Sequence, residues 1–185
     1  MIKLLFKLDN IKPMKKNHTM PAFKYCVLLL FAISLVVSCK RNHAKLNAAD
    51  RALVKDSVTN MAANIAADIS KNGPRAWLNY FEDTPDFFMA NEGQLVFQDH
   101  QSAKTFILNT VVKNILQIKL RWEHIRIDPL TSRLASIGAD FHEDQTIASG
   151  KNLSIDGYFT GIAHYDGHRW KLRNAHWSIK APSVK

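Results

Sequence analysis

The chain has 185 residues, 46% of them hydrophobic, and a formal net charge of +9. This length is sufficient for one domain that buries a core, together with a short extension. Six of the 25 basic residues and one of the 16 acidic residues precede residue 39, which leaves 19 basic and 15 acidic residues, about +4, spread without a block. We therefore expect no nucleic-acid partner, and a solvated basic surface is the simpler interpretation.

Residues 1–38 are expected to form a signal peptide. A basic segment precedes an uncharged apolar run from Tyr25 to Val37, which is too short to span a bilayer. The run ends at Val36-Val37-Ser38-Cys39, which resembles the lipobox of bacterial lipoproteins. The resemblance implies that Cys39 is lipidated and anchors the protein to a membrane surface of the cell envelope, on the periplasmic or extracellular side. A plain anchor helix and an unlipidated signal peptide are the alternatives, and Met14 and Met20 are alternative starts.

The cysteine count fits an exported protein. The chain has two cysteines, Cys26 inside the apolar run and Cys39 after it. No cysteine follows Cys39, so the rest of the chain has no thiol to form a disulfide, bind a metal or act as a nucleophile. We interpret residues 39–49 as a lipidated tether and residues 50–182 as the folded domain.

Helical patterns dominate the first half of this domain. Apolar residues at a spacing of 3.6 predict an amphipathic helix from Ala48 to Ser70, followed by the stop signal Lys71-Asn72-Gly73-Pro74. Pro74 favours the start of a second, short helix that ends near Phe81. Asp99 is a good N-cap for a third helix, which the pattern extends to Gln117.

Strand patterns flank and follow the third helix. Short apolar runs on either side of Asn91-Glu92-Gly93 predict a small hairpin with a three-residue loop. Two long strands are expected at Ile118–Ile127 and Arg133–Gln145, joined by a turn. The apolar phase changes within the first of them, which predicts a bulge near Glu123-His124.

The segment from Ile155 to Ile179 is expected to be a long hairpin. Asp166-Gly167 between two alternating runs predicts a two-residue loop, in which Tyr165 faces His168. Directly opposed residues share a face of a ladder, so this register places four residues on one inward face. They are Trp170, Leu172, Asn174 and His176.

The order of these elements resembles the nuclear transport factor 2-like (SnoaL-like) superfamily. The resemblance covers about residues 50–182, and its most specific part is the hairpin. Gly157-Tyr158-Phe159-Thr160, Asp166-Gly167, Trp170-Lys171-Leu172 and His176-Trp177-Ser178 are similar to the pattern of SnoaL-like members. It implies an α+β fold in which a curved, mostly antiparallel sheet packs on three helices to form a cone with a pocket.

Candidate site residues follow from the register and the resemblance. We expect His176 to act as a base and Asn174 as an orienting donor, with a structural role for a buried His176 as the alternative. The predicted ligand contacts are Tyr80, Trp122, His124, Phe159 and Trp170. His142-Glu143-Asp144 is a weak metal signal, so neither a metal nor a cofactor is expected.

Three functions are consistent with these patterns. The first is a lipid-anchored domain whose cone binds a small apolar or amphipathic molecule. The second is a cofactor-free lyase, isomerase or hydrolase that uses His176. The third is a structural module that forms a homodimer through the sheet, where Tyr158, Thr160 and Ile162 are expected.

Overall fold

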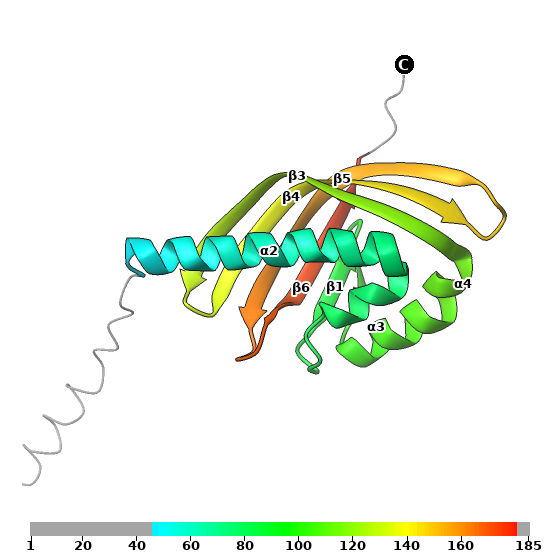
Figure 1. Ribbon diagram of the computed structural model, residues 1–185. Coiled ribbons are helices and arrows are strands. Elements are labelled where there is room, and N and C mark those ends of the chain that lie inside the picture. Colours follow the sequence, from blue (N-terminus) through cyan, green and yellow to red (C-terminus); the bar gives the residue numbers. More distant parts are fainter. Residues whose placement is uncertain (1–45, 181–185) are drawn as a thin grey trace, which may run out of the picture. The chain divides into compact units, whose positions relative to one another are not determined.

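The computed structural model describes residues 46–180. The predicted signal peptide, Cys39 and most of the tether lie outside these residues. The described part is a six-stranded curved sheet with helices against its concave face (Figure 1). This architecture confirms the predicted α+β cone. None of the helices within residues 46–180 has the length and apolarity needed to cross a membrane.

The sheet has the strand order β2-β1-β6-β5-β4-β3. Its neighbouring strands are antiparallel, except that β1 pairs with β6 in parallel. The strands are β1 (Phe88–Asn91), β2 (Gln94–Phe97), β3 (Ile115–Thr131), β4 (Leu134–Ile147), β5 (Asn152–Tyr165) and β6 (Trp170–Ile179).

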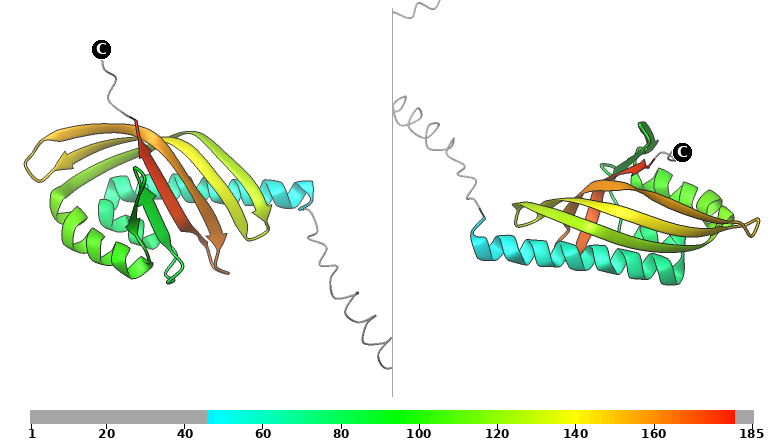
Figure 2. Two further views of the ribbon diagram at one scale, coloured as in Figure 1. Left: turned by 180° about the vertical axis from the view of Figure 1, so that it is seen from behind. Right: turned by 90° about the horizontal axis from the view of Figure 1, so that it is seen from above.

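The long first helix, α2 (Ala48–Asn72), has the predicted position. Asn47 caps its N-terminus, where the Asn47 side chain accepts a hydrogen bond from the Asp50 backbone N–H. Gly73, whose φ of 72° favours glycine, follows its C-terminus. Its apolar stripe faces the concave side of the sheet, and the sheet curves over it (Figure 2). The buried residues of this stripe are Val54, Val58, Met61, Ala62, Ile65 and Ile69.

Two short elements follow α2. The predicted second helix is a 3₁₀-helix, η1 (Pro74–Asn79), with Pro74 in its first turn. The predicted small hairpin is present as β1 and β2, but its loop has two residues rather than three. Asn91 pairs with Gln94, and Glu92 and Gly93 both have positive φ, as a tight hairpin turn of this length favours.

The third helix begins as predicted and ends earlier than predicted. Asp99 caps α3 (His100–Phe106) in a capping box with Ser102. A π-helical turn, η2 (Ile107–Val111), and a final turn, α4 (Val112–Asn114), complete the helix. The prediction of a helix to Gln117 is wrong, because β3 begins at Ile115 and its backbone pairs with β4 from that residue onward.

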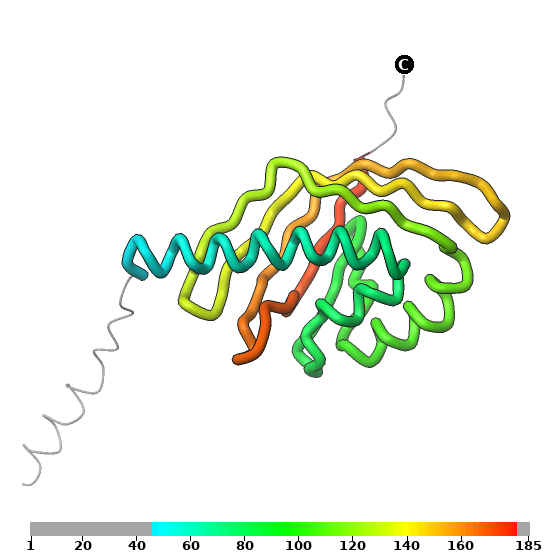
Figure 3. The backbone as a smooth tube through the Cα atoms, viewed as in Figure 1, coloured from blue at the N-terminus to red at the C-terminus, as the bar shows by residue number. Residues whose placement is uncertain are grey.

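The predicted bulge in the first long strand is present. The register between β3 and β4 shifts between Glu123 and Arg126, and His124 has a φ of 50°. The backbone of β3 changes direction at this place (Figure 3). The bend explains the change of apolar phase, because Leu120 at an even position and Ile127 at an odd position can then both face the concave side. Both side chains are buried.

The predicted loop of the last hairpin is wrong. Tyr165 pairs with Trp170 rather than with His168, so the loop has four residues, Asp166 to Arg169. Asp166 stabilises this longer loop, because its carboxylate accepts hydrogen bonds from the backbone N–H groups of His168 and Arg169.

A second departure lies farther along β6. Ala163 pairs with Leu172 but Ile162 pairs with Asn174, so Arg173 is the extra residue of a β-bulge. A one-residue shift moves every later side chain to the other face. Ala175 and Trp177 therefore point into the cone, whereas Asn174 and His176 point out.

Candidate functional site

The cone contains a cavity of about 330 Å³ between the sheet and the helical elements η1, α3 and η2. This volume lies within the range of roughly 300–1,000 Å³ that small-molecule sites occupy. Six aromatic side chains form much of its wall: Trp77, Phe81, Phe97, Phe106, Phe141 and Trp177. The other apolar residues that line it are Pro74, Met89, Val96, Ile107, Val111, Ile115, Ile118, Ile155 and Ile179.

Three polar side chains share this apolar cavity: Asn91 from β1 and Glu143 and Gln145 from β4. The side-chain amide of Gln145 donates a 2.7 Å hydrogen bond from Nε2 to Glu143 Oε2. Burial raises the pKa of the Glu143 carboxyl, and the hydrogen bond from Gln145 acts in the opposite direction. The cavity therefore contains a carboxyl group that loses its proton less readily than an exposed one.

Asn91 contributes a second unusual group. Its side-chain oxygen, Oδ1, is buried and has no hydrogen-bond partner among residues 46–180. A buried carbonyl oxygen without a donor is costly, by about 1–3 kcal/mol. This oxygen has almost no accessible surface, so a ligand in the cavity does not reach it.

A cluster of aromatic rings holds the cavity wall in place. Trp177 packs against Trp77 with 5.3 Å between ring centroids, and against Phe141 with 4.7 Å. Phe159 and Trp122 lie behind Trp177, at 4.9 and 5.8 Å. The indole N–H of Trp122 donates to the backbone oxygen of Ala62, which ties β3 to α2.

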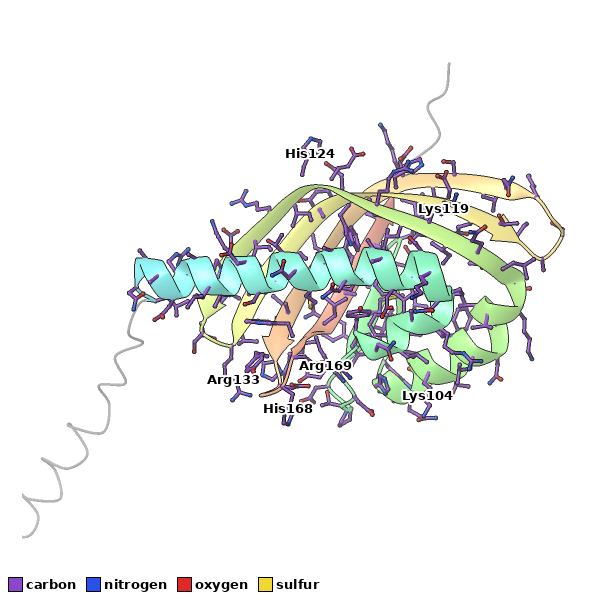
Figure 4. All side chains as sticks on the ribbon, in the orientation of Figure 1. Lys104, Lys119, His124, Arg133, His168 and Arg169 are labelled. Atoms are coloured by element: carbon purple, nitrogen blue, oxygen red, sulfur yellow. The ribbon has the colours of Figure 1, made fainter. Side chains whose placement is uncertain are left out.

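The predicted ligand contacts do not line the cavity. Phe159 and Trp122 support its wall from behind, and Trp170 packs on Tyr165 near the loop of the last hairpin. His124 points outward from β3 (Figure 4) and its Nδ1 lies 2.8 Å from Asp140 Oδ2.

Tyr80 is tied to α2 instead. Its hydroxyl donates a 2.9 Å hydrogen bond to Asp68, and burial, followed by this bond and the Asp68 charge, raises the pKa of Tyr80 to about 12. These contacts give it a structural role between α2 and the segment after η1.

The predicted inward placement of His176 and Asn174 is wrong. His176 is exposed and pairs with Thr160 on the outer face, and Asn174 Oδ1 accepts a hydrogen bond from the Ile162 N–H at the bulge. The physical reason is the bulge at Arg173, which reverses the direction of the side chains after it. The predicted inward placement of Leu172, which precedes the bulge, is confirmed, since its side chain is fully buried.

Sequence reasoning missed the polar residues of the cavity, although a signal for them existed. Ala135, Ile137, Ala139 and Phe141 alternate with more polar residues along β4, which predicts one apolar, inward face. The same alternation continues to Glu143 and Gln145, and the structure places both on that face.

His142 lies on the opposite face from Glu143, so the weak metal signal separates across the sheet. Its Nδ1 is 2.6 Å from Asp156 Oδ1, and its Nε2 is 3.1 Å from Asp144 Oδ1. Within residues 46–180 no group of three such side chains is arranged to hold a metal ion. The hydrogen bond to Asp156, aided by Asp144, raises the pKa of His142.

The contacts of His142 with Asp156 and Asp144 predict a pH-dependent contribution to the free energy of unfolding. Because the pKa of His142 is raised on folding, the contribution is complete below the unfolded value, about 6.5, and is lost as the pH rises through the folded value. We expect the difference in unfolding free energy between the wild type and His142→Asn to shrink between pH 5.5 and 8.5 in urea titrations. The matched control is His168→Asn in the exposed loop, and a difference for His142→Asn that does not vary with pH would contradict the prediction.

The fold and its interior cavity together define a nuclear transport factor 2-like cone. Comparison of the sequence with protein families and with curated proteins gives no match. Solved structures with the same fold include a nuclear transport factor 2-like superfamily protein from Salmonella enterica serovar Typhimurium, with a TM-score of 0.61 and 15% identity over 72% of this chain and 95% of that one.

Two further structures come from proteins whose names are those of enzymes. A hexachlorocyclohexane dehydrochlorinase (LinA, type 2) gives a TM-score of 0.60 and 11% identity, over 72% of this chain and 90% of its own. A putative scytalone dehydratase from Novosphingobium aromaticivorans gives the same TM-score, 0.60, the same identity, 11%, and the same coverages, 72% and 90%. At such low identity the similarity shows a shared fold alone.

Proposed function

We propose that the domain binds one small, largely apolar molecule in the cavity, and that Asn91, Glu143 and Gln145 contact its polar group. The observation that carries this proposal is an open apolar volume of about 330 Å³ whose lining includes three polar side chains, Asn91, Glu143 and Gln145. Ligand sites are typically apolar with a few placed polar groups. A core built for stability alone is close-packed and would not leave this volume.

A cavity-filling substitution tests the proposal. Val111 of η2 lines the cavity, whereas Asn109 of the same turn is exposed. We expect Val111→Trp to weaken binding of N-phenyl-1-naphthylamine by at least about tenfold, because the indole occupies the ligand's space, and Asn109→Trp to leave it unchanged. The measurement is a fluorescence titration of the probe. Equal binding by both variants, or no binding by the wild type, would reject the cavity as the site.

We propose acid–base catalysis as a second candidate function. A carboxyl whose pKa burial raises holds its proton more readily than an exposed one and can act as an acid or a base, and Glu143 is such a group. The reaction would be that of a cofactor-free lyase, isomerase or hydrolase, with Glu143 rather than His176 as the reagent. A panel of epoxides, enones and β-hydroxy carbonyls tests this, and turnover that survived Glu143→Gln would remove Glu143 from the mechanism.

We also propose that the protein is anchored to the envelope through lipid on Cys39. The support is the sequence pattern alone, since Cys39 lies outside the described residues. Two or more acyl chains give stable membrane attachment. In fractionated cells we expect the wild type in the membrane pellet and Cys39→Ser in the soluble fraction, and a variant that still sediments with membranes would contradict lipidation.

Pairing of two copies through the outer face of the sheet is a further proposal. Phe88 and Tyr158 are 44% and 43% exposed on that face, and a second copy packed there would remove their apolar surface from water. Analytical ultracentrifugation of the wild type and a Tyr158→Lys variant tests it, and a wild type that sediments as a monomer would reject it.

A further inference from the structure

The charge of the cavity indicates which polar group its ligand carries. Glu143 is the one ionisable side chain in the lining, and no lysine, arginine or histidine is among the described residues that form it. The other two polar side chains of the lining, Asn91 and Gln145, are neutral amides. The cavity therefore presents one carboxyl group and no positively charged group that would neutralise an anion.

Gln145 leaves much of the Glu143 carboxylate free for a ligand. It is the one hydrogen-bond donor to the Glu143 side chain among residues 46–180, and it bonds to Oε2. A half-buried carboxylate with a single neutral donor is poorly compensated for the loss of water, which is why desolvation raises the pKa of Glu143. A positively charged partner in the cavity would supply the missing compensation.

The aromatic wall favours the same kind of ligand. Trp77, Phe81 and Trp177 are among the rings that line the cavity. The face of an aromatic ring attracts a cation, and the attraction is strongest for tryptophan and where water is excluded. A cation here would contact both the rings and the carboxylate, whereas a ligand carboxylate would meet a like charge and only the neutral amides of Asn91 and Gln145.

We propose that the cavity selects an apolar amine, bound as the ammonium ion, whose N–H groups donate to Glu143 while its carbon skeleton packs on the aromatic wall. This inference rests on the proposed binding function and specifies its ligand class. A neutral alcohol of the same skeleton retains the packing and one neutral hydrogen bond. An alkyl carboxylate of the same skeleton loses both the charge pairing and the hydrogen bond to Glu143.

The test compares three ligands that share one compact skeleton: 1-adamantanemethylamine, 1-adamantanemethanol and adamantane-1-carboxylate. Isothermal titration calorimetry with the full chain at pH 7.5 measures each affinity without a chromophore. We expect the amine to bind about tenfold more tightly than the alcohol, and the carboxylate more weakly than either, because charge-assisted hydrogen bonds are roughly twice as strong as neutral ones.

A pair of matched variants assigns the preference to the cavity. Glu143→Gln keeps the size of the side chain and removes its charge, so we expect the amine to bind no better than the alcohol. Glu123→Gln, on the exposed part of β3, makes the same change outside the cavity and should leave the tenfold preference intact.

The outcomes separate this inference from the function on which it rests. Equal affinities for the three ligands, a preference for the carboxylate, or an amine preference that survives Glu143→Gln would overturn the amine assignment and leave binding in the cavity standing. If N-phenyl-1-naphthylamine binds and the amine does not, the assignment is also overturned. If neither the probe nor any adamantane ligand binds, both proposals fail.

Discussion

Replacing Phe159 by alanine is expected to lower the free energy of unfolding by about 3–5 kcal/mol. Phe159 is 1% exposed and lies with ring centroids 5.2 Å from Trp122 and 4.9 Å from Trp177. Removing its ring leaves a void at the centre of the sheet's inner face, and rigid strands on either side cannot close around it. Urea unfolding followed by tryptophan fluorescence measures the loss.

The same substitution is expected to weaken binding in the cavity, although Phe159 does not line it. Trp177 would lose the ring that supports it from behind and would no longer hold one orientation in the wall.

Phe88→Ala is the matched control for the loss of stability, because Phe88 is 44% exposed on the outer face. We expect Phe88→Ala to lower the free energy of unfolding by less than about 1 kcal/mol. Comparable losses of unfolding free energy from both variants would show that the burial of Phe159 is not the cause.

Gly157→Ala is the second substitution with a large expected effect. Overpacking is expected to lower the free energy of unfolding by at least about 1–3 kcal/mol. A Cβ at this position would lie 2.2 Å from the backbone oxygen of Ser178 and 2.5 Å from the ring of Phe141. The first neighbour belongs to the β5–β6 ladder and the second to the cavity wall, so neither can move without disturbing the pairing or the ring cluster. Thermal unfolding monitored by circular dichroism measures the change.

Gly150→Ala is the control that separates the cost of a steric clash from the cost of backbone strain. Gly150 has a φ of 82° but no atom within 4 Å of a built Cβ, so its substitution is strained without a clash. We expect a loss of about 1 kcal/mol for this control. A loss at Gly157 no larger than that at Gly150 would mean that the strands separate easily to admit the methyl group.

Local signals in the sequence were sufficient for most of the architecture. The cap at Asp99, the stop at Gly73 and the break of apolar phase near His124 each depend on a few neighbouring residues, and each appears where it was predicted. The end of the third helix could not be placed this way, because Ile115 is recruited into β3 by pairing with Ile147, which is distant in the sequence.

The candidate site was harder to predict because it depends on long-range register. Asp166-Gly167 favours a two-residue loop, but the carboxylate of Asp166 stabilises a longer one, and Arg173 then adds a bulge. The longer loop shifts the pairing by two residues and keeps Leu172 inward, so the bulge alone puts His176 on the outer face. Glu143 and Gln145 could have been predicted from simple alternation along β4, which has no such irregularity between Leu134 and Thr146 in its pairing with β5.

The bulge at Arg173 also bears on how such a cavity can change during evolution. Loss of the extra residue would make β6 a regular strand and leave Ala175 and Trp177 on the inner face, because Asn174 would then follow Leu172 in ordinary alternation. Substitutions that removed the bulge without a change of length would instead turn the rest of β6 over and bring His176 to the inner wall in place of Trp177. Relatives of equal length here could thus carry different chemistry inside the cone, whereas a relative shorter by this one residue would keep the same inner side chains.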